Sequence, residues 1–592
     1  MAEREDAKLL RDPGFRALLV VLALLVGILF SHGRRITSDG IDHYVYLRSL
    51  AVDHDLDLAN DYALVSPRSE SDARLTSLGR TGNAHPVGPA LAWAPFYLVG
   101  DVLTRLAGRP PDGLGGFYDD AVALGGLFYG WLGLVVLYRT ASREVSRGPA
   151  LLAAVGIGLG TFLYFYLAHA PTMAHAPAFA AAALFVDLWL RPLPEGARRG
   201  ALLGAACGLV ALMRWADVLI ALLWAASLLP RLLEPSRWRR LAVEILAFAG
   251  AALLVFAPQM LVWRLLYGSW LTIPQGEGFI AGAPAWAGVL FSPRHGLFSW
   301  SPLLYLGVAG LLAWTRRAPL RLVGALVFFV ALARVNAGVA DWWGGAAFGA
   351  RRFDAMLPLF GLGLALALSW LSALSMRKPL VVGAALVAAF VLWNTLLAEH
   401  YASGAWDYAA PVSFEEMGRA AAAGVDRRLG SPFSLPAALL EWSRSGRAPA
   451  DWESLYMQRR HARWSIRMGL DERMFLEDGW SEPRDESGVI ARRIVSGSAG
   501  LVIPLHGPRP YRFGLRARSD GPSQRLRVLF NDRFLGAGDV GPDWTDLEVD
   551  VPAEAVRPGR NFVRLRQPGE GPWDGEITVA GAWLEPDSDP AT

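Results

Sequence analysis

The chain has 592 residues, of which 53% are hydrophobic and 19% are charged, and its formal net charge is only +3. So small a net charge excludes the strongly basic surface of a nucleic-acid-binding protein. The single cysteine, Cys207, lies in an apolar segment, so no disulfide can form within the chain. Many apolar runs reach the roughly 20 residues that a helix needs to cross a bilayer. The composition therefore predicts a membrane protein with many spans.

About eleven apolar runs are predicted to be transmembrane helices, because backbone that faces lipid must satisfy its own hydrogen bonds. They centre on residues 15–32, 118–138, 148–167, 173–190, 200–214, 216–230, 241–266, 300–315, 319–335, 354–373 and 379–398. The fifth and sixth runs are short and are expected to form a tight hairpin. The first run is expected to be retained, because the sequence after it does not have the small residues of a signal-peptide cleavage site.

Basic residues gather at the amino terminus and in alternate loops. They are Arg4, Lys8, Arg11, Arg139, Arg143, Arg147, Arg191, Arg198, Arg199, Arg231, Arg237, Arg239, Arg240, Arg316, Arg317, Arg321, Arg377 and Lys378. If the spans alternate, all of these residues fall on one side, which the positive-inside rule makes cytoplasmic. We therefore expect a multi-pass protein of a bacterial inner (cytoplasmic) membrane, with a cytoplasmic amino terminus and a periplasmic carboxyl-terminal domain.

The apolar run from His85 to Gly100 is interrupted by three prolines. Counting it as a span would reverse the side of every later loop. We interpret it as an interfacial or re-entrant helix on the outer face, with Trp93 and Tyr97 at headgroup depth.

The domain organisation follows from hydrophobicity. Residues 1–398 are predicted to form a helical membrane domain with polar and aromatic outer loops at 31–117, 268–302 and 336–353. Residues 399–479 are a mixed linker with short helices near 414–423 and 435–442. Residues 480–592 contain short alternating segments, separated by turn residues such as Asn531-Asp532, which predict an antiparallel, jelly-roll-like β-sandwich.

Two aspartates in the first outer loop are the candidate catalytic residues. Asp39 and Asp42 directly follow the first span, where a simple anchor would need no acid. One carboxylate could take a proton from an attacking hydroxyl, which typically contributes 10²–10⁴-fold to a rate. The alternative is that both acids only cap the helix that begins near Ile41.

These outer-loop residues resemble those of the GT-C class of polyprenyl-phosphate-sugar-dependent glycosyltransferases, which includes bacterial aminoarabinose transferases and protein O-mannosyltransferases. Asp39, Tyr44 and Arg48 match the first motif of that class, and His85-Pro86 matches the second. The acid pair of the class is adjacent, whereas here Gly40 follows Asp39. The identity of the base therefore stays open between Asp39 and Asp42. The resemblance implies a polyprenyl-phosphate-linked sugar donor.

Cations are expected beside the departing phosphate. Arg351 and Arg352 begin a span on the outer side, and a planar guanidinium binds phosphate oxygens bidentately. Arg294 and His295 are second candidates. The alternative is that these arginines extend to the headgroup layer without a further role.

Further outer-loop residues are candidates for substrate binding. Trp342 and Trp343 could stack on sugar faces or belong to an aromatic belt. His169 and His175 lack a defined carboxylate partner, so hydrogen bonding is favoured over a metal site, and His175 is retained as a substrate-binding candidate. Arg214 and Asp217, one helical turn apart, are predicted to pair with each other.

The sequence therefore predicts a membrane glycosyltransferase that moves one sugar from a polyprenyl-phosphate carrier to an extracytoplasmic glycan, lipid or protein, with inversion. No cofactor is assigned, and the need for a divalent cation stays open. Two other classes compete: a lipid-linked glycan transporter or flippase, and a non-catalytic envelope protein whose sandwich binds carbohydrate through Trp544, Trp573 and Trp583.

Overall fold

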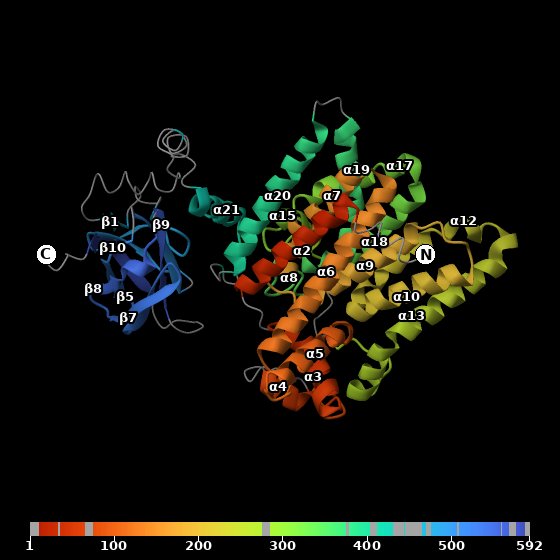
Figure 1. Cartoon of the computed structure of the whole chain (residues 1–592), viewed down its shortest axis with the longest axis horizontal. Helices are drawn as coiled ribbons and strands as arrows, with labels where there is room; N and C mark the ends of the chain where they lie inside the picture. The colour runs from red at the N-terminus through yellow and green to blue at the C-terminus, as the bar shows by residue number, and fades with distance from the viewer. Residues whose placement is uncertain are drawn as a thin grey trace. The chain divides into compact units, whose positions relative to one another are not determined.

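The computed structural model divides the chain into two compact units, Met1–Ala398 and Glu399–Thr592. It describes residues 11–32, 36–65, 75–274, 284–373, 378–402, 406, 411–429, 443, 464–468, 475–495, 497–505, 508–557, 559–567 and 576–586. The first unit is helical and the second contains all the strands that the structure describes (Figure 1).

The helical unit consists of helices of very different lengths. They are α2 (Pro13–His32), α3 (Asp39–Arg48), the π-helical η1 (Ser49–Asp53), α4 (Leu58–Val65), α5 (Gly88–Leu106), α6 (Gly116–Glu144), α7 (Arg147–Leu159), α8 (Leu163–Ala168), α9 (His175–Leu190), α10 (Ala197–Met213), η2 (Trp215–Ile220), α11 (Ala221–Ala226), α12 (Leu229–Leu232), η3 (Pro235–Arg237), α13 (Trp238–Tyr267), α14 (Trp286–Phe291), α15 (Leu297–Trp300), α16 (Leu304–Leu311), α17 (Trp314–Arg317), α18 (Pro319–Gly338), η4 (Arg351–Met356), α19 (Leu357–Ala373) and α20 (Pro379–Ala402).

Among the described residues, six helices are long and apolar enough to cross a membrane. They are α2, α6, η3 with α13, α18, η4 with α19, and α20. The other five predicted spans are also helical, but shorter helices form them: α7 with α8, α9, α10, η2 with α11 and α12, and α15 to α17. The predicted positions of the apolar helices therefore agree with the structure, and the number of spans stays a prediction.

A row of glycines lets α10 lie directly against α13. A Cβ atom built on Gly200 or Gly204 would lie 2.1 Å from a carbonyl oxygen of α13, and one built on Gly208 would lie 2.5 Å from another. Small residues spaced four apart allow such close backbone contact, on which helix packing in membranes depends. The fifth and sixth apolar runs were expected to pack on each other as a hairpin. Instead, the chain turns at Arg214, and α10 packs along its length against α13.

The arginine-rich turns lie at one end of the helical unit. Glu244 is fully buried there, with Arg199 at 2.9 Å and Arg231 at 3.0 Å. Asp187 pairs with Arg191 at 2.5 Å near the end of α9. Helix α9 has 16 residues, so about 24 Å separates this end from His175 at the start of the helix. Paired acids thus accompany the basic residues that set the predicted orientation.

Helix α5 forms at the proline-rich run. Its residues Trp93 and Tyr97 are buried, with Trp93 fully buried and Tyr97 3% exposed. Trp93 packs edge-on against His43, and Tyr97 packs against Tyr118. These aromatics therefore pack against protein, and their depth in a membrane stays a prediction. Figure 1 shows α3, α4 and α5 gathered at one end of the helical unit.

Among its described residues the second unit contains one α-helix, one short 3-10 helix and ten strands. They are α21 (Phe414–Leu429), β1 (Trp464–Arg467), β2 (Arg484–Glu486), β3 (Val489–Arg493), β4 (Ser498–Leu505), β5 (Tyr511–Ser519), β6 (Gln524–Phe530), β7 (Arg533–Val540), β8 (Thr545–Val551), the short η6 (Ala553–Ala555), β9 (Gly559–Arg566) and β10 (Ile577–Pro586). Helix α21 covers the predicted helix at 414–423, and the predicted helix at 435–442 lies outside the described residues.

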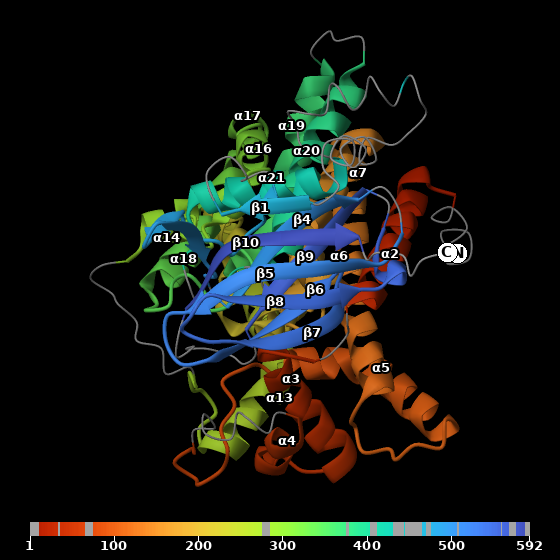
Figure 2. The ribbon, with the colours of Figure 1, turned by 90° about the vertical axis from the view of Figure 1, so that its left-hand side faces the viewer.

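The strands form two antiparallel sheets with a shared apolar core. One sheet has the order β2-β3-β10-β5-β8, with β1 also paired to β10, and the other has the order β4-β9-β6-β7. Figure 2 shows β10, β5 and β8 side by side. Asn531 and Asp532 both have positive φ and join β6 to β7, as expected of a two-residue hairpin turn. The predicted segments correspond to seven of the strands, whereas β1, β2 and β7 were not predicted.

Substitution of Gly204 by Ala should lower the stability of the helical unit by about 1–3 kcal/mol, because its methyl group would overlap the Phe248 carbonyl of α13. Gly250 is the matched control, since it lies on α13 with nothing within 4 Å of a built Cβ. Thermal unfolding in detergent should show a lower Tm for Gly204→Ala and no loss for Gly250→Ala. Equal melting temperatures for the two variants would contradict the proposed packing.

Candidate functional site

The first turn of α3 carries both candidate acids. Asp39 and Asp42 are three residues apart, so their side chains lie on the same face of the helix. The residue before the helix, Ser38, makes no side-chain capping bond. Gly40 lies between the acids, and a Cβ atom there would be 2.6 Å from the Thr172 carbonyl oxygen, so α3 packs tightly on the loop before α9. Capping alone therefore does not explain the acids, because each has a partner elsewhere in the chain.

Asp39 forms an ion pair with Arg351. Nη1 of Arg351 donates to Oδ2 of Asp39 at 2.7 Å, and Nη2 donates to the Gly344 carbonyl at 3.0 Å. Burial raises the pKa of Asp39, but the charge of Arg351 and then that of His85 outweigh burial and hold this pKa well below its usual range. Asp39 is therefore ionised.

Asp42 has different partners. The Tyr62 hydroxyl donates to Oδ1 at 2.6 Å, and His85 Nδ1 lies 3.2 Å from Oδ2. Burial raises the pKa of Asp42 above its usual value, although His85 and the Tyr62 hydroxyl oppose the rise. Two carboxylates on one helical turn thus differ in basicity because only one of them faces an arginine.

His85 lies between the two acids. Its Nε2 atom is 3.8 Å from Asp39 Oδ2, while Nδ1 faces Asp42. The side chains of Asp39, Asp42 and His85 are 27–30% exposed, so a substrate can reach them. The His-Pro motif and the acids, which lie more than 40 residues apart in the chain, therefore meet in space.

Four polar side chains hold the loop that carries His85. Asn83 donates to the Asp42 carbonyl at 2.6 Å, and its own backbone N–H donates to the Tyr267 hydroxyl at 2.9 Å. Gln259 Oε1 accepts from the Val87 backbone N–H at 2.8 Å. His43 Nδ1 lies 2.9 Å from the Pro86 carbonyl. The carboxyl-terminal part of α13 thus fixes this loop against α3.

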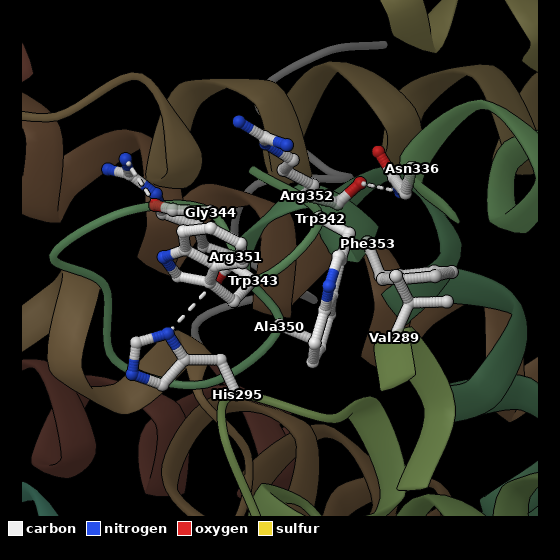
Figure 3. Close-up of a pocket in the computed structure, with 10 residues that line it drawn as sticks. All are labelled: Val289, His295, Asn336, Trp342, Trp343, Gly344, Ala350, Arg351, Arg352 and Phe353. Carbon is white, nitrogen blue, oxygen red and sulfur yellow. Dashed lines mark hydrogen bonds between the residues drawn. The ribbon is translucent and has the colours of Figure 1, made fainter. Parts of the chain in front are cut away.

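Figure 3 shows a pocket lined by aromatic and basic residues. It is lined by Val289, His295, Asn336, Trp342, Trp343, Gly344, Ala350, Arg351, Arg352 and Phe353. Arg351 lines this pocket and also pairs with Asp39, so one guanidinium connects the acids to the aromatic residues.

The polar groups of the pocket are held by local bonds. Arg352 donates to Asp341 Oδ2 at 2.6 Å, and the Arg294 guanidinium lies 3.9 Å above the Trp343 ring. His295 Nδ1 lies 2.9 Å from the Trp343 carbonyl, and burial lowers the pKa of His295 to about 4. The two tryptophans therefore lie among four predicted residues that come from two loops: Arg351, Arg352, Arg294 and His295.

The loop from α18 to η4 needs glycine in order to bring Arg351 to the acids. Gly344, Gly345 and Gly349 all have positive φ, a region that residues with a Cβ rarely adopt. The run Trp342-Trp343-Gly344-Gly345 thus combines aromatic side chains with a turn that positions them.

A buried polar cluster behind Arg351 was not predicted as a unit. His175 Nδ1 lies 2.9 Å from Asp354 Oδ2, and Arg214 Nη1 lies 3.1 Å from the same oxygen and 3.2 Å from the Arg351 carbonyl. Arg214 and Asp217 do pair, at 3.7 Å, but Arg214 lies closer to Asp354. An acid at the very start of the apolar run 354–373 is a functional signal that would have identified Asp354.

Other predicted site residues are buried and bind groups of the protein itself. Tyr44 is 2% exposed and donates to the Gly113 carbonyl at 2.6 Å, and buried Arg48 binds Asp61 at 2.6 Å and Asp53 at 2.9 Å. Both side chains thus fix the segment around α3, and their role in substrate binding stays a prediction. His175 is likewise buried on Asp354 rather than facing the acids.

The remaining candidates are the tryptophans of the second unit and the histidines considered for a metal site. Trp583 covers Gly514 on the neighbouring strand, and Trp544 lies 5.4 Å from the Arg518 guanidinium. Trp573 lies outside the described residues. Within the described parts of the chain, no group of three or more histidine, cysteine or acidic residues is arranged to hold a metal ion. His169 stacks on Phe165 instead.

No known protein-family model matches this chain, and no curated protein matches its sequence. Solved structures do share parts of its fold. The apo crystal structure of ArnT from Cupriavidus metallidurans aligns with a TM-score of 0.43 and 17% identity, over 72% of this chain and 70% of that one.

Two other matches involve carbohydrate-binding proteins and are shorter. The Podospora anserina GH26-CBM35 β-(1,4)-mannanase aligns with a TM-score of 0.18 and 14% identity, over 22% of this chain and 28% of that one. The carboxyl-terminal CBM6 of the Zobellia galactanivorans laminarinase LamC aligns with a TM-score of 0.16 and 14% identity, over 21% of this chain and 98% of that one. Identities and TM-scores this low do not establish a function, which is therefore argued below from the site.

His43 is predicted to stay neutral between about pH 5 and 8, with its proton on Nδ1. Burial lowers its pKa from 6.5 to about 3, and a carbonyl partner requires Nδ1 to donate. Since unfolding then takes up a proton, this residue makes the fold less stable as pH falls from 6.5 towards 3. ¹⁵N-histidine NMR should show the Nδ1–H tautomer, assigned by its loss in His43→Gln. A titration of this signal near pH 6.5 would contradict the assignment.

Proposed function

We propose that this protein is a membrane glycosyltransferase of the GT-C class. It moves one sugar from a polyprenyl-phosphate carrier to an extracytoplasmic acceptor, which is an envelope glycan, a lipid or a protein. The observation that carries this proposal is the position of Arg351, which pairs with Asp39 at 2.7 Å and also lines the pocket of Trp342 and Trp343. Arg351 thus lies next to both a candidate base and aromatic side chains that could bind a sugar, and it is itself a cation that could bind a phosphate.

The chemistry of the leaving group explains why one acid is enough. A glycoside hydrolase needs a second carboxyl group to protonate its leaving alcohol. A lipid phosphate departs with its negative charge and needs no proton. The remaining task is to take the proton from the acceptor hydroxyl as it attacks the anomeric carbon, and Asp39 and Asp42 are placed for it. A single displacement inverts the anomeric centre.

Arg351 suits the phosphate. As the bond to the sugar breaks, charge develops on the phosphate oxygens, and a cation already in place stabilises that charge. The planar guanidinium presents two parallel N–H groups, which match two phosphate oxygens. Both N–H edges of Arg351 now point at oxygen acceptors, one on Asp39 and one on Gly344.

The pocket suits a sugar ring. Trp342 and Trp343 offer aromatic faces, and Asn336, which donates to the Arg352 carbonyl at 3.2 Å, lines the same wall. Pockets for small ligands commonly combine apolar walls with a few fixed polar groups. In this proposal the donor sugar lies against the aromatic side chains and its phosphate lies at Arg351.

The competing functions have less support from the site. A transporter or flippase is expected to place charged groups near the bilayer midplane. Here the buried charges of α9 and α10 lie near helix ends, with His175 and Arg214 on the side of the acids and Asp187 and Arg199 on the other. A non-catalytic anchor gives no reason for two acids, a histidine and an arginine to converge.

Asp39→Asn or Asp42→Asn is expected to abolish sugar transfer, with a loss of about 10²–10⁴-fold for the residue that serves as the base. Mass spectrometry of envelope glycans and lipids, compared between cells with and without the gene, identifies the missing sugar and any accumulated lipid carrier. Complementation with each variant then measures the loss.

Asp57→Asn is the matched control, because Asp57 lies in the same outer loop, is exposed, and makes only local backbone contacts among those described. Protein levels in the membrane fraction should be equal for all three variants. Full activity in both Asp39→Asn and Asp42→Asn would refute the mechanism.

A further inference from the structure

The partner of Arg351 in this structure is an anion that belongs to the protein. The ion pair with Asp39 joins the first turn of α3 to η4 across 312 residues of sequence, at a distance of 2.7 Å. Arg351 is the group to which the proposed function assigns the phosphate. The guanidinium edge that faces Asp39 is therefore occupied before any donor arrives.

A carboxylate and a phosphate at one guanidinium compete. Both need the same N–H groups, and two anions held together in a poorly solvated site repel each other strongly. The backbone on both sides limits the room for adjustment, because Gly40 packs on Thr172 and the Arg351 carbonyl is bonded to Arg214. The arriving phosphate must therefore displace the carboxylate from the guanidinium.

We propose that the donor phosphate and Asp39 compete for Arg351, so that Asp39 is held as an inactive base in the free enzyme and is released only in the donor complex. This inference rests on the proposed function and names the regulation of its site. It assigns the base to Asp39, a choice that the sequence left open. It also makes the order of binding functional, because donor binding prepares the base for the acceptor.

The released carboxylate becomes more basic for two reasons. It loses its arginine counter-charge, and it keeps Asp42 as a neighbour on the same helical turn. In the transfer step, the acceptor oxygen forms a bond to the anomeric carbon and its proton moves to Asp39. The bond from that carbon to the phosphate oxygen breaks, and its electron pair leaves with the phosphate.

The test measures binding rather than transfer. Undecaprenyl phosphate is titrated into the purified full-length protein in detergent, and Kd is obtained from intrinsic tryptophan fluorescence, with microscale thermophoresis as a second method. Asp39→Asn removes the competing anion at nearly constant shape. It is expected to bind undecaprenyl phosphate about tenfold more tightly than the wild type, although it has lost transfer.

Two further variants separate competition from a general effect of charge. Asp42→Asn removes an acid from the same helical turn without touching Arg351, and it should tighten binding by less than about twofold, as expected for an indirect effect. In an Arg351→Gln background, Asp39→Asn should no longer change Kd. Melting temperatures show whether each variant is folded.

Each result has a defined meaning. Equal or weaker binding by Asp39→Asn, with Arg351-dependent binding by the wild type, overturns the competition and leaves the proposed donor standing. An equal gain with and without Arg351 also overturns the competition. Failure of both the wild type and Asp39→Asn to bind undecaprenyl phosphate overturns the competition together with the proposed donor.

Discussion

The ion pair between Asp39 and Arg351 is the contact on which the proposed site depends. It joins the first turn of α3 to η4, and these segments are far apart in the chain. Each partner is anchored behind the contact: α3 by Gly40 against Thr172, and η4 by the bond from Arg214 to the Arg351 carbonyl. A salt bridge on a mobile surface contributes little, whereas one between two fixed backbones defines a geometry.

That contact also explains how identical side chains acquire different chemistry. Asp39 and Asp42 are one turn apart, yet the pKa of one is lowered and that of the other is raised. Burial acts on both in the same direction, so the difference comes from the arginine that only Asp39 faces among the described contacts. Neighbouring acids with divergent pKa values are a recurring feature of catalytic sites. Burial raises the pKa of Asp42, whereas His85 and the hydrogen bond from Tyr62 lower it, so these two groups favour the ionised form.

The helices could be predicted from the sequence because hydrophobicity is a local property of the chain. Each of the eleven apolar runs is helical in the structure, and seven strands follow the alternating segments of the second unit. Strand β7 was missed because Gly536 and Gly538 weaken its strand pattern, while in the fold these glycines make room for Val549 and Leu547 of β8. That information lies on another strand and cannot be read from β7 itself.

The site could be predicted only in part, for the same reason. Asp39, Asp42, His85 and Arg351 stand out locally, since charged residues are costly beside apolar runs. Tyr62 and Asn83 do not, because a tyrosine or an asparagine in a polar loop carries no signal until its partner is known. Tyr44 and Arg48 show the converse: both match a motif, but the sequence does not reveal that their polar groups bind Gly113, Asp53 and Asp61.

The buried cluster behind Arg351 shows why its guanidinium can change partners while its backbone cannot. Asp354, Arg214 and His175 are held within about 3 Å of one another, in surroundings where breaking a pair by removing one member typically costs 3–5 kcal/mol. Arg214 uses the same Nη1 atom to bind Asp354 and the Arg351 carbonyl, so this network fixes the start of η4. Among the described contacts of the guanidinium are a partly exposed carboxylate and a backbone carbonyl. In the proposed cycle, the Arg351 backbone stays fixed while its guanidinium binds Asp39 at rest and the donor phosphate during turnover.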